Sequence, residues 1–214
     1  MSKKLLNILV TAGPTREFFD PVRFLSNPSS GKMGYAVAAA AHARGHKVFL
    51  ISGPTALPDP IPSKKISRIT SARDMHREVL KRFSKTDVVI MTAAVSDYRP
   101  KKIVSYKVKK TGNEMTIELV PNPDILAELG KKKKKGQILV GFAAETKDFI
   151  KNASAKIKKK NLNYIVVNNV KSSKIGFGAD QNEVVIIDAQ GHTQKISLAS
   201  KILVARKILE LIQS

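Results

Sequence analysis

Residues 7–13, Asn-Ile-Leu-Val-Thr-Ala-Gly, form a short apolar run that ends at Gly13-Pro14. A run of this length before Gly-Pro is typical of a buried parallel strand that leads into a loop. After a long loop, Gly31-Lys32-Met33-Gly34 opens an alanine-rich stretch that reaches Arg44 and is followed by a glycine. This stretch predicts a helix that packs closely on the strand and ends at a glycine C-cap.

The alternation of strand and helix signals continues along the chain. It predicts strands over residues 47–53, 87–94, 138–142 and 164–168, and helices over residues 72–83, after Asn122-Pro123, and over 148–160. Strands that alternate with helices imply right-handed crossovers and a mostly parallel sheet covered on both faces. The predicted fold class is therefore α/β and Rossmann-like.

Two stretches depart from this alternation. Residues 107–110 and 115–120 flank Thr111-Gly112-Asn113, which predicts a hairpin-like arm that leaves the sheet. Residues 183–188 and 193–196 flank Ala189-Gln190-Gly191 and predict a second hairpin, before a last helix over about residues 198–212. We find no internal repeat and no linker, and we expect one domain over residues 1–214.

Composition narrows the function classes. The 214 residues are 43% hydrophobic and contain no cysteine, which excludes disulfides, thiolate metal sites and thiol nucleophiles. No apolar run approaches a membrane span and no signal peptide is recognisable, so we expect a cytoplasmic protein that does not bind membranes. The net charge of +21 would attract polyanions, but it does not choose among nucleic acid, membrane surface and phosphorylated ligands. The lysine run 131–135 is typical of a solvated helix end.

Ligands of open α/β sheets bind outside the carboxyl ends of the strands. The loop after the first strand supplies Ser29, Ser30 and Gly31 before a helix, a pattern that can form an anion cradle from free backbone N–H groups. An ordinary N-cap explains the same residues equally well. The loop has neither the Walker spacing nor the compact Gly-x-Gly-x-x-Gly of a dinucleotide site.

Later strand and helix ends pose similar alternatives. Asp97, in Ala93-Ala94-Val95-Ser96-Asp97-Tyr98-Arg99, could face a ribose or a metal-bound phosphate, or could cap its own turn. The segments 122–125 and 141–146 are ambiguous in the same way.

The order of seven segments is more specific than any one of them. Thr-Ala-Gly-Pro-Thr-Arg-Glu, Ser-Asn-x-Ser-Ser-Gly-Lys-Met-Gly, Ala-Ala-Val-x-Asp-Tyr-Arg, Lys-x-Lys-Lys, Asn-Pro-Asp-Ile, Gly-Phe-Ala-Ala-Glu-Thr and a lysine-rich helix before Asn-Leu together resemble the bacterial phosphopantothenoylcysteine synthetase family. The resemblance runs from about Leu5 to the final helix. Pro28 departs from it, because the family commonly has histidine there. The flavin decarboxylase that is often fused upstream is missing from this sequence, which leaves a free-standing form or an excised domain as alternatives.

The resemblance implies a ligase that joins 4'-phosphopantothenate to L-cysteine with CTP as co-substrate, through an acyl-cytidylate, with Mg²⁺ and as a homodimer. It implies catalytic roles for Asn27 and Arg23, and places Asp97 beside the nucleotide and its metal ion. Lys156 and Lys160, four residues apart on one helical face, match two nucleotide-binding lysines. The other nucleotide contacts that it implies are Ala93, Ala94, Lys107, Pro123, Asp124, Ile125, Leu126 and Phe142.

Two other classes remain as alternatives. The first is a nucleic-acid-binding Rossmann-like protein, which only the net charge favours. Aromatic residues make up 6% of the chain and tryptophan is absent, so bases would have few side chains on which to stack. An NAD(P)-dependent reductase is compatible with the fold and opposed by the missing glycine fingerprint.

Overall fold

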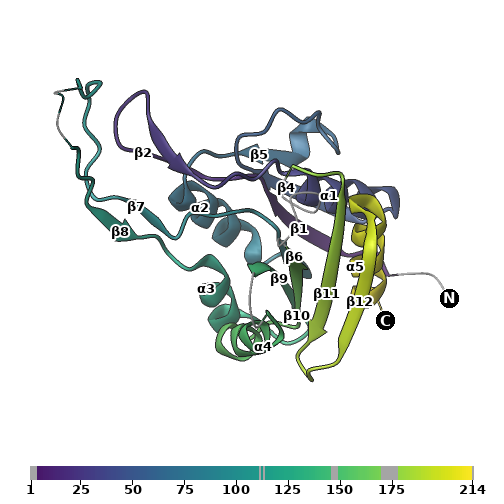
Figure 1. Cartoon of the computed structure of the whole chain (residues 1–214). Coiled ribbons are helices and arrows are strands. Elements are labelled where there is room, and N and C mark those ends of the chain that lie inside the picture. The colour runs from purple at the N-terminus through teal and green to yellow at the C-terminus, as the bar shows by residue number, and fades with distance from the viewer. Residues whose placement is uncertain (1–3, 111, 113, 146–148, 170–177, 214) are drawn as a thin grey trace.

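An eight-stranded sheet forms the centre of the protein (Figure 1). The computed structural model describes residues 4–110, 112, 114–145, 149–169 and 178–213. The strand order is β12-β11-β10-β9-β6-β1-β4-β5, in which β11 and β12 are antiparallel to their neighbours and the other neighbours pair in parallel. The bounds are β1 Asn7–Ala12, β4 Lys47–Ser52, β5 Ile66–Arg68, β6 Val88–Met91, β9 Ile138–Glu145, β10 Tyr164–Asn169, β11 Gln181–Asp188 and β12 Thr193–Ser200. This arrangement confirms the predicted Rossmann-like fold.

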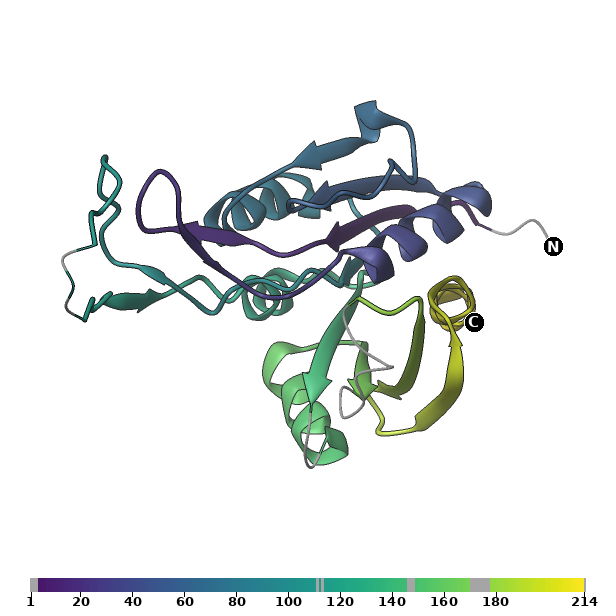
Figure 2. The same ribbon diagram turned by 45° about the horizontal axis from the view of Figure 1, so that its top comes forward.

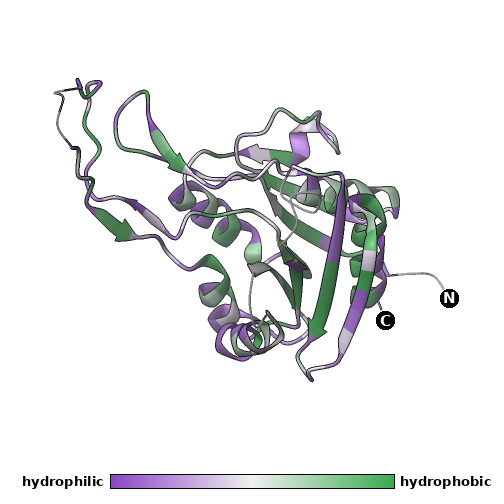
Figure 3. Ribbon diagram, viewed as in Figure 1, coloured by the Kyte–Doolittle hydropathy of each residue, from purple (hydrophilic) through white to green (hydrophobic). Residues whose placement is uncertain are grey.

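Helices cover both faces of the sheet (Figure 2). On one face, α1 (Lys32–Ala43) and α5 (Lys201–Gln213) pack against each other and share an apolar cluster with the sheet. On the other face, α2 (Ala72–Phe83), α3 (Ile125–Lys132) and α4 (Phe149–Lys160) contribute to a second cluster. The strands between them are strongly hydrophobic (Figure 3), as expected for a sheet buried on two sides.

The helix signals act locally as the sequence predicts. Ser71 and Asp74 form a reciprocal capping box at the start of α2. α1 ends before Gly45, whose φ of 84° is the left-handed conformation that glycine adopts most easily. The predicted start of α4 at residue 148 lies outside the described residues.

The chain reverses its direction of travel across the sheet at β1. From β1 it passes through α1 to β4 and β5 on one side, and then returns to β6 on the other side of β1. The loops after β1 and β6 therefore diverge above a crevice at the carboxyl ends of these strands, which is where open α/β sheets bind ligands.

The C-terminal hairpin is confirmed, but the last helix begins later than predicted. β12 continues to Ser200, which pairs with Gln181, so α5 begins at Lys201 instead of near residue 198. The strand pairing at this end of β12 outweighs the apolar periodicity that suggested an earlier helix start.

The predicted strands of the arm are wrong in position. Strand pairing occurs only at the base, between β7 (Tyr98–Pro100) and β8 (Leu119–Pro121); the described residues of 101–118 carry no strand. The pairing lies where an ion pair between Lys101 and Glu118 (2.6 Å) joins the two chains. The lysine-rich residues 107–110 have no apolar face to bury, so their intrinsic preference for the strand conformation is not enough to form a strand. We call residues 98–121 the arm.

A short hairpin that the sequence did not reveal accompanies the arm. β2 (Arg16–Phe18) pairs with β3 (Phe24–Ser26) inside the long loop after β1. Figures 1 and 2 show this hairpin and the arm extending together away from the body of the protein. None of the helices in the described part of the chain could span a membrane.

Candidate functional site

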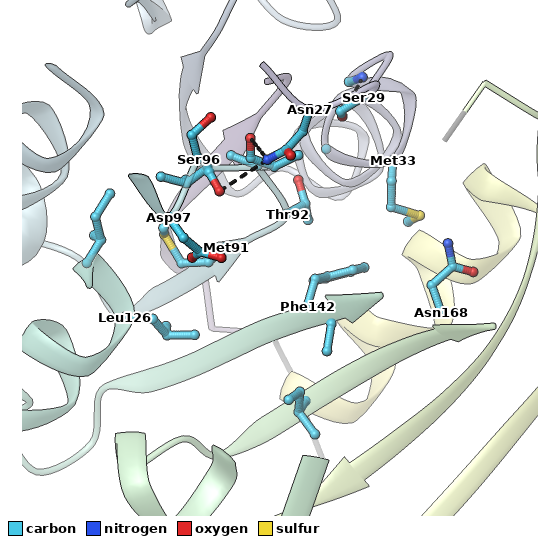
Figure 4. Close-up of a pocket in the computed structure, with 18 of the residues that line it drawn as sticks. Asn27, Ser29, Met33, Met91, Thr92, Ser96, Asp97, Leu126, Phe142 and Asn168 are labelled. Carbon is cyan, nitrogen blue, oxygen red and sulfur yellow. Dashed lines mark hydrogen bonds between the residues drawn. The ribbon is translucent and has the colours of Figure 1, made fainter. Parts of the chain in front are cut away.

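A cavity of about 520 Å³ lies at the crevice between the loops that follow β1 and β6. The α1 N-terminus, α3, the end of β9 and α4 complete its walls (Figure 4). Its lining includes most of the residues that the sequence singled out: Asn27, Ser29, Ser30, Gly31, Ala93, Ala94, Asp97, Pro123, Asp124, Ile125, Leu126, Phe142, Lys156 and Lys160. Segments that lie more than 120 positions apart in the sequence thus meet at one edge of the sheet.

Gly34 lets α1 lie close to the strand ends. A Cβ at this position would clash with the Thr92 hydroxyl and would come within 2.9 Å of the carbonyl oxygen of Thr11. The Thr92 hydroxyl donates a hydrogen bond to this same carbonyl, so the space is already filled. The absence of a side chain at Gly34 therefore sets the position of the α1 N-terminus relative to β1 and β6.

The loop 29–31 presents backbone N–H groups at the start of α1. Gly31, in the left-handed conformation (φ 79°), is the N-cap residue, and no side chain caps the helix. The N–H groups of Gly31 and Lys32 donate long hydrogen bonds, of 3.4 and 3.5 Å, to the hydroxyls of Ser29 and Ser30. The ordinary serine N-cap is therefore not formed, and the geometry suits an anion at this helix end.

Asn27 is fixed across the crevice to the loop after β6. Its amide nitrogen donates to the carbonyl oxygens of Ala94 (3.2 Å) and Val95 (3.3 Å), as Figure 4 shows. Both loops of the site are thereby held together, and the amide oxygen of Asn27 is the polar atom that these contacts leave over. In this structure the amide N–H groups of Asn27 therefore already donate to carbonyl oxygens of the protein.

The cavity has a positive balance of charge. It is lined by Lys32, Lys156, Lys160 and Lys201 and by two aspartates, Asp97 and Asp124. Asp97 is exposed at the rim, and its backbone carbonyl accepts a hydrogen bond from the N–H of Asn122 (2.8 Å). The excess of ammonium groups in the lining, together with the α1 N-terminus, favours an anionic ligand.

Asp124 and Lys160 form an ion pair with an oxygen–nitrogen distance of 2.8 Å. Asp124 also caps α3 by accepting from the N–H of Ala127 (3.0 Å). Burial favours a higher pKa for Asp124, but the hydrogen bonds from Lys160 and Ala127 outweigh it and lower the pKa. Both residues therefore have structural roles that the sequence did not assign to them.

Arg23 and Lys107 lie outside the lining of the cavity in their own chain. Arg23 belongs to the β2–β3 hairpin, where its Nε donates to the Asp20 carboxylate (2.9 Å) and its guanidinium reaches the carbonyl oxygen of Val108 on the arm (2.7 Å). Lys107 is exposed, next to this anchor. The structure thus groups these two predicted site residues on the projecting unit, away from Asn27.

Asp20 is the buried centre of this anchor. It also accepts hydrogen bonds from the N–H groups of Val22, Arg23 and Val108. Burial alone would raise the pKa of Asp20, but the hydrogen bonds from Arg23 and from these backbone groups hold it far below its usual range.

The lining also includes functional candidates that the sequence did not single out. They are polar residues at the ends of other elements: Asn168, Asn182 and Lys201. Asn168 is the last residue of the strand predicted over residues 164–168, so the rule that ligands bind at the carboxyl ends of strands could have identified it. Asn182 is the second residue of β11, which runs antiparallel to β10, so its place at this edge depends on that antiparallel pairing.

Comparison with known proteins identifies the family of the chain. The family described as "DNA/pantothenate metabolism flavoprotein C-terminal domain" matches residues 4–214. The chain belongs to this family.

Members of the family and their structures are similar over nearly all of the chain. The coenzyme A biosynthesis bifunctional protein CoaBC of Bacillus subtilis (strain 168) is 49% identical over 95% of the chain, which spans 50% of that protein. A crystal structure of the C-terminal domain of a CoaBC protein is 42% identical, with a TM-score of 0.82 over 99% of this chain and 97% of that one. A Cab2 variant in complex with phosphopantothenate-cysteine shares the fold at 15% identity, with a TM-score of 0.76 over 97% of this chain and 85% of that one. The chain spans about half the length of the CoaBC relatives.

The anchor at Asp20 predicts how firmly the arm is held. Asp20→Asn removes the charge that pairs with Arg23, so we expect trypsin to cleave the arm lysines severalfold faster than in the wild type. Asp59→Asn breaks an ion pair with Arg68 away from the arm and serves as the control. The folded pKa lies below the unfolded value of about 3.9. The stabilisation is therefore complete above that pH and is lost as the pH falls below it. Equal cleavage of Asp20→Asn and wild type at pH 7 would contradict this role.

Proposed function

We propose that the chain is a ligase of coenzyme A biosynthesis that joins 4'-phosphopantothenate to L-cysteine. In this proposal the carboxylate oxygen of phosphopantothenate attacks the α-phosphorus of CTP, and pyrophosphate leaves. The cysteine amine then attacks the acyl carbon, loses a proton, and displaces CMP to give 4'-phosphopantothenoylcysteine. The observation that carries the proposal is the cavity at the β1–β6 crevice, which the α1 N-terminus, Asn27 and Asp97 line in a member of this family.

The chemistry requires positioned donors and cations more than a strong base, because charge builds on phosphate oxygens and then on the acyl oxygen. The lining suits this requirement. At the start of α1 the N–H groups of Gly31 and Lys32 make long hydrogen bonds to serine hydroxyls and can turn to a phosphate, and Lys156 and Lys160 add positive charge from α4. The ion pair of Lys160 with Asp124 holds one ammonium in place before the nucleotide arrives.

Asn27 would act at the reacting centre. Its brace to the carbonyl oxygens of Ala94 and Val95 fixes its position at the crevice, so little reorganisation is needed when the substrates bind. We propose that this amide contacts the acyl-cytidylate and helps its collapse.

The site also fits a magnesium ion. The described residues contain no group of three or more His, Cys, Asp or Glu that could hold a metal by itself. Of the two aspartates in the cavity lining, Asp124 is paired with Lys160, and Asp97 is exposed at the rim. Mg²⁺ at triphosphate sites takes most of its ligands from phosphates and water, with one or two carboxylates from the protein. We propose Asp97 as that carboxylate; the bound ion would neutralise triphosphate charge.

We propose further that the active unit is a homodimer with composite sites. Arg23 and Lys107 lie together on the projecting unit and outside the cavity of their own chain, so they would reach the cavity of a second subunit. The same unit exposes a set of large apolar side chains that a partner would cover: Val22, Phe24, Leu25, Tyr98, Ile103, Tyr106, Met115 and Leu119.

The first test is release of pyrophosphate. We expect it with phosphopantothenate and CTP together, and ligated product only when cysteine is added. Asn27→Ala should bind CTP with an affinity within about twofold of the wild type, but ligate on the order of a hundredfold more slowly, as for loss of one transition-state contact. Gln137→Ala is the matched control, because that amide also donates to two backbone carbonyls, of Phe83 (2.9 Å) and Thr86 (2.7 Å), outside the cavity lining. Undiminished ligation by Asn27→Ala would remove this residue from the mechanism, and absence of pyrophosphate with every nucleotide would reject the ligase.

Mixing two inactive variants tests the composite site. Asn27→Ala damages the cavity and Lys107→Ala damages the arm, so a heterodimer in which arms cross would contain one intact site. We expect activity to return toward a quarter of the wild-type value after subunit exchange, because half of the subunits pair as heterodimers. No recovery after exchange verified by mass spectrometry, or full activity of a monomer in light scattering, would contradict the composite site.

A further inference from the structure

One corner of the cavity is built from elements that the proposed chemistry does not use. Asn168 is the penultimate residue of β10, Asn182 is the second residue of β11 and Lys201 begins α5; all three line the cavity. Strand pairing brings them together, because Asn168 pairs with Val184 and Asn182 pairs with Ala199. Met33 of α1 closes the corner from above, and Figure 4 shows Asn168 and Met33 on this side of the cavity.

The two asparagines carry buried acceptors without partners. Asn168 is 9% exposed and Asn182 is 3% exposed, and the Oδ1 atom of each has no hydrogen-bond partner among the residues that the structure describes. The amide nitrogen of Asn182 faces the sulfur of Met33 (3.8 Å), which leaves its oxygen as the unsatisfied group. An unpaired buried carbonyl destabilises a folded protein, and such groups are rare outside functional sites. The corner therefore suits a ligand that brings N–H donors.

Lys201 adds a donor beside these acceptors. It is 6% exposed, and its ammonium donates to the carbonyl oxygen of Ala179. Burial lowers its pKa, the nearby charge of Lys32 lowers it further, and Asp180 opposes the shift. A ligand edge that fits this corner must present donors to the amide oxygens next to an acceptor for the ammonium.

A flat apolar surface adjoins the corner. Phe142 pairs with Val166 across β9 and β10, and Asn168 pairs with Ala144, so Phe142 and Asn168 are diagonal neighbours on one face of the sheet. A planar ring stacked on Phe142 would turn its edge toward the asparagines. The aliphatic chain of a pantothenate group has no such ring.

We propose that Asn182, together with Asn168 and Lys201, selects the nucleobase. The edge that fits is an exocyclic amine beside a ring acceptor, as in cytosine or adenine. Uracil places a carbonyl oxygen where the amine would be, and two acceptors would face each other. This inference rests on the proposed function only in that the cavity binds a nucleoside triphosphate.

Direct binding of nucleotides to the full chain tests the selection. By calorimetry we expect the wild type to bind CTP at least about tenfold more tightly than UTP. Asn182→Leu should weaken CTP about tenfold and leave UTP nearly unchanged, because it removes the acceptor that only the amine uses. The unfolding temperature of Asn182→Leu should equal or exceed that of the wild type, since an apolar side chain of similar size replaces an unsatisfied carbonyl.

Asn163→Leu is the matched control. The oxygen of Asn163 accepts from the N–H of Leu139 (2.9 Å) and from Lys133 (3.1 Å), outside the cavity lining. This variant should unfold at a lower temperature and keep the preference for CTP. A wild type without preference, or an unchanged preference in Asn182→Leu, overturns the proposal.

Two further comparisons separate this inference from the ligase proposal. The first comparison uses nucleotide binding measured without phosphopantothenate or cysteine. Even if the wild type does not ligate, a loss of the preference for CTP over UTP in Asn182→Leu supports the selection. A chain that ligates while Asn182→Leu keeps its preference rejects the selection alone. The second comparison is a titration with phosphopantothenate alone. If Asn182→Leu binds this molecule more weakly and binds both nucleotides as the wild type does, the corner belongs to pantothenate and the base assignment is overturned.

Discussion

The close approach of α1 to the ends of β1 and β6 is the contact on which the site depends. At Gly34 no side chain can be added without meeting Thr92, Ala12 or the backbone of Thr11. This contact aims the start of α1 into the crevice and carries loop 29–31 and Asn27 with it. The brace from Asn27 to Ala94 and Val95 can then close the two loops over one cavity.

Charged groups of the site act in pairs, and each pair links a site element to the fold. Asp124 caps α3 and holds Lys160 on the neighbouring α4. Asp20 holds Arg23 and, through it, the arm. Exposed ion pairs stabilise proteins little, so their main effect here is to fix where an ammonium or guanidinium stands. A mobile cation would have to be ordered when the anion binds, at the expense of affinity.

The fold was largely predictable because its signals are local. Apolar runs that end at glycine, the Ser71–Asp74 capping box and Gly45 after α1 each identify an element from neighbouring residues. The β2–β3 hairpin was missed because each strand has three residues, too few for a periodic pattern. The strands of the arm were misplaced because lysines at alternate positions imitate a strand pattern without a face to bury.

The site residues that directly follow strand ends were predictable from the sequence. Those that reach the cavity through pairing between distant segments were less so. Loop 29–31 and Asp97 follow predicted strands, and the rule for open sheets places them together. Asn182 and Lys201 reach the cavity only through the antiparallel β11 and β12, whose registers no local signal encodes. The pairing of Lys160 with Asp124 spans 36 positions in the sequence and was hidden for the same reason.

The central claim is that the carboxylate of phosphopantothenate bonds to the α-phosphate of the nucleotide in the β1–β6 crevice. Phosphopantothenate labelled with ¹⁸O in its carboxylate tests this most directly, with mass analysis of the released phosphates after one turnover. The proposed route transfers one labelled oxygen to CMP and none to pyrophosphate, because the bridging oxygen stays on phosphorus when the amine attacks the acyl carbon. Label in inorganic phosphate, or unlabelled CMP beside ligated product, would contradict the acyl-nucleotide and with it the role assigned to the crevice.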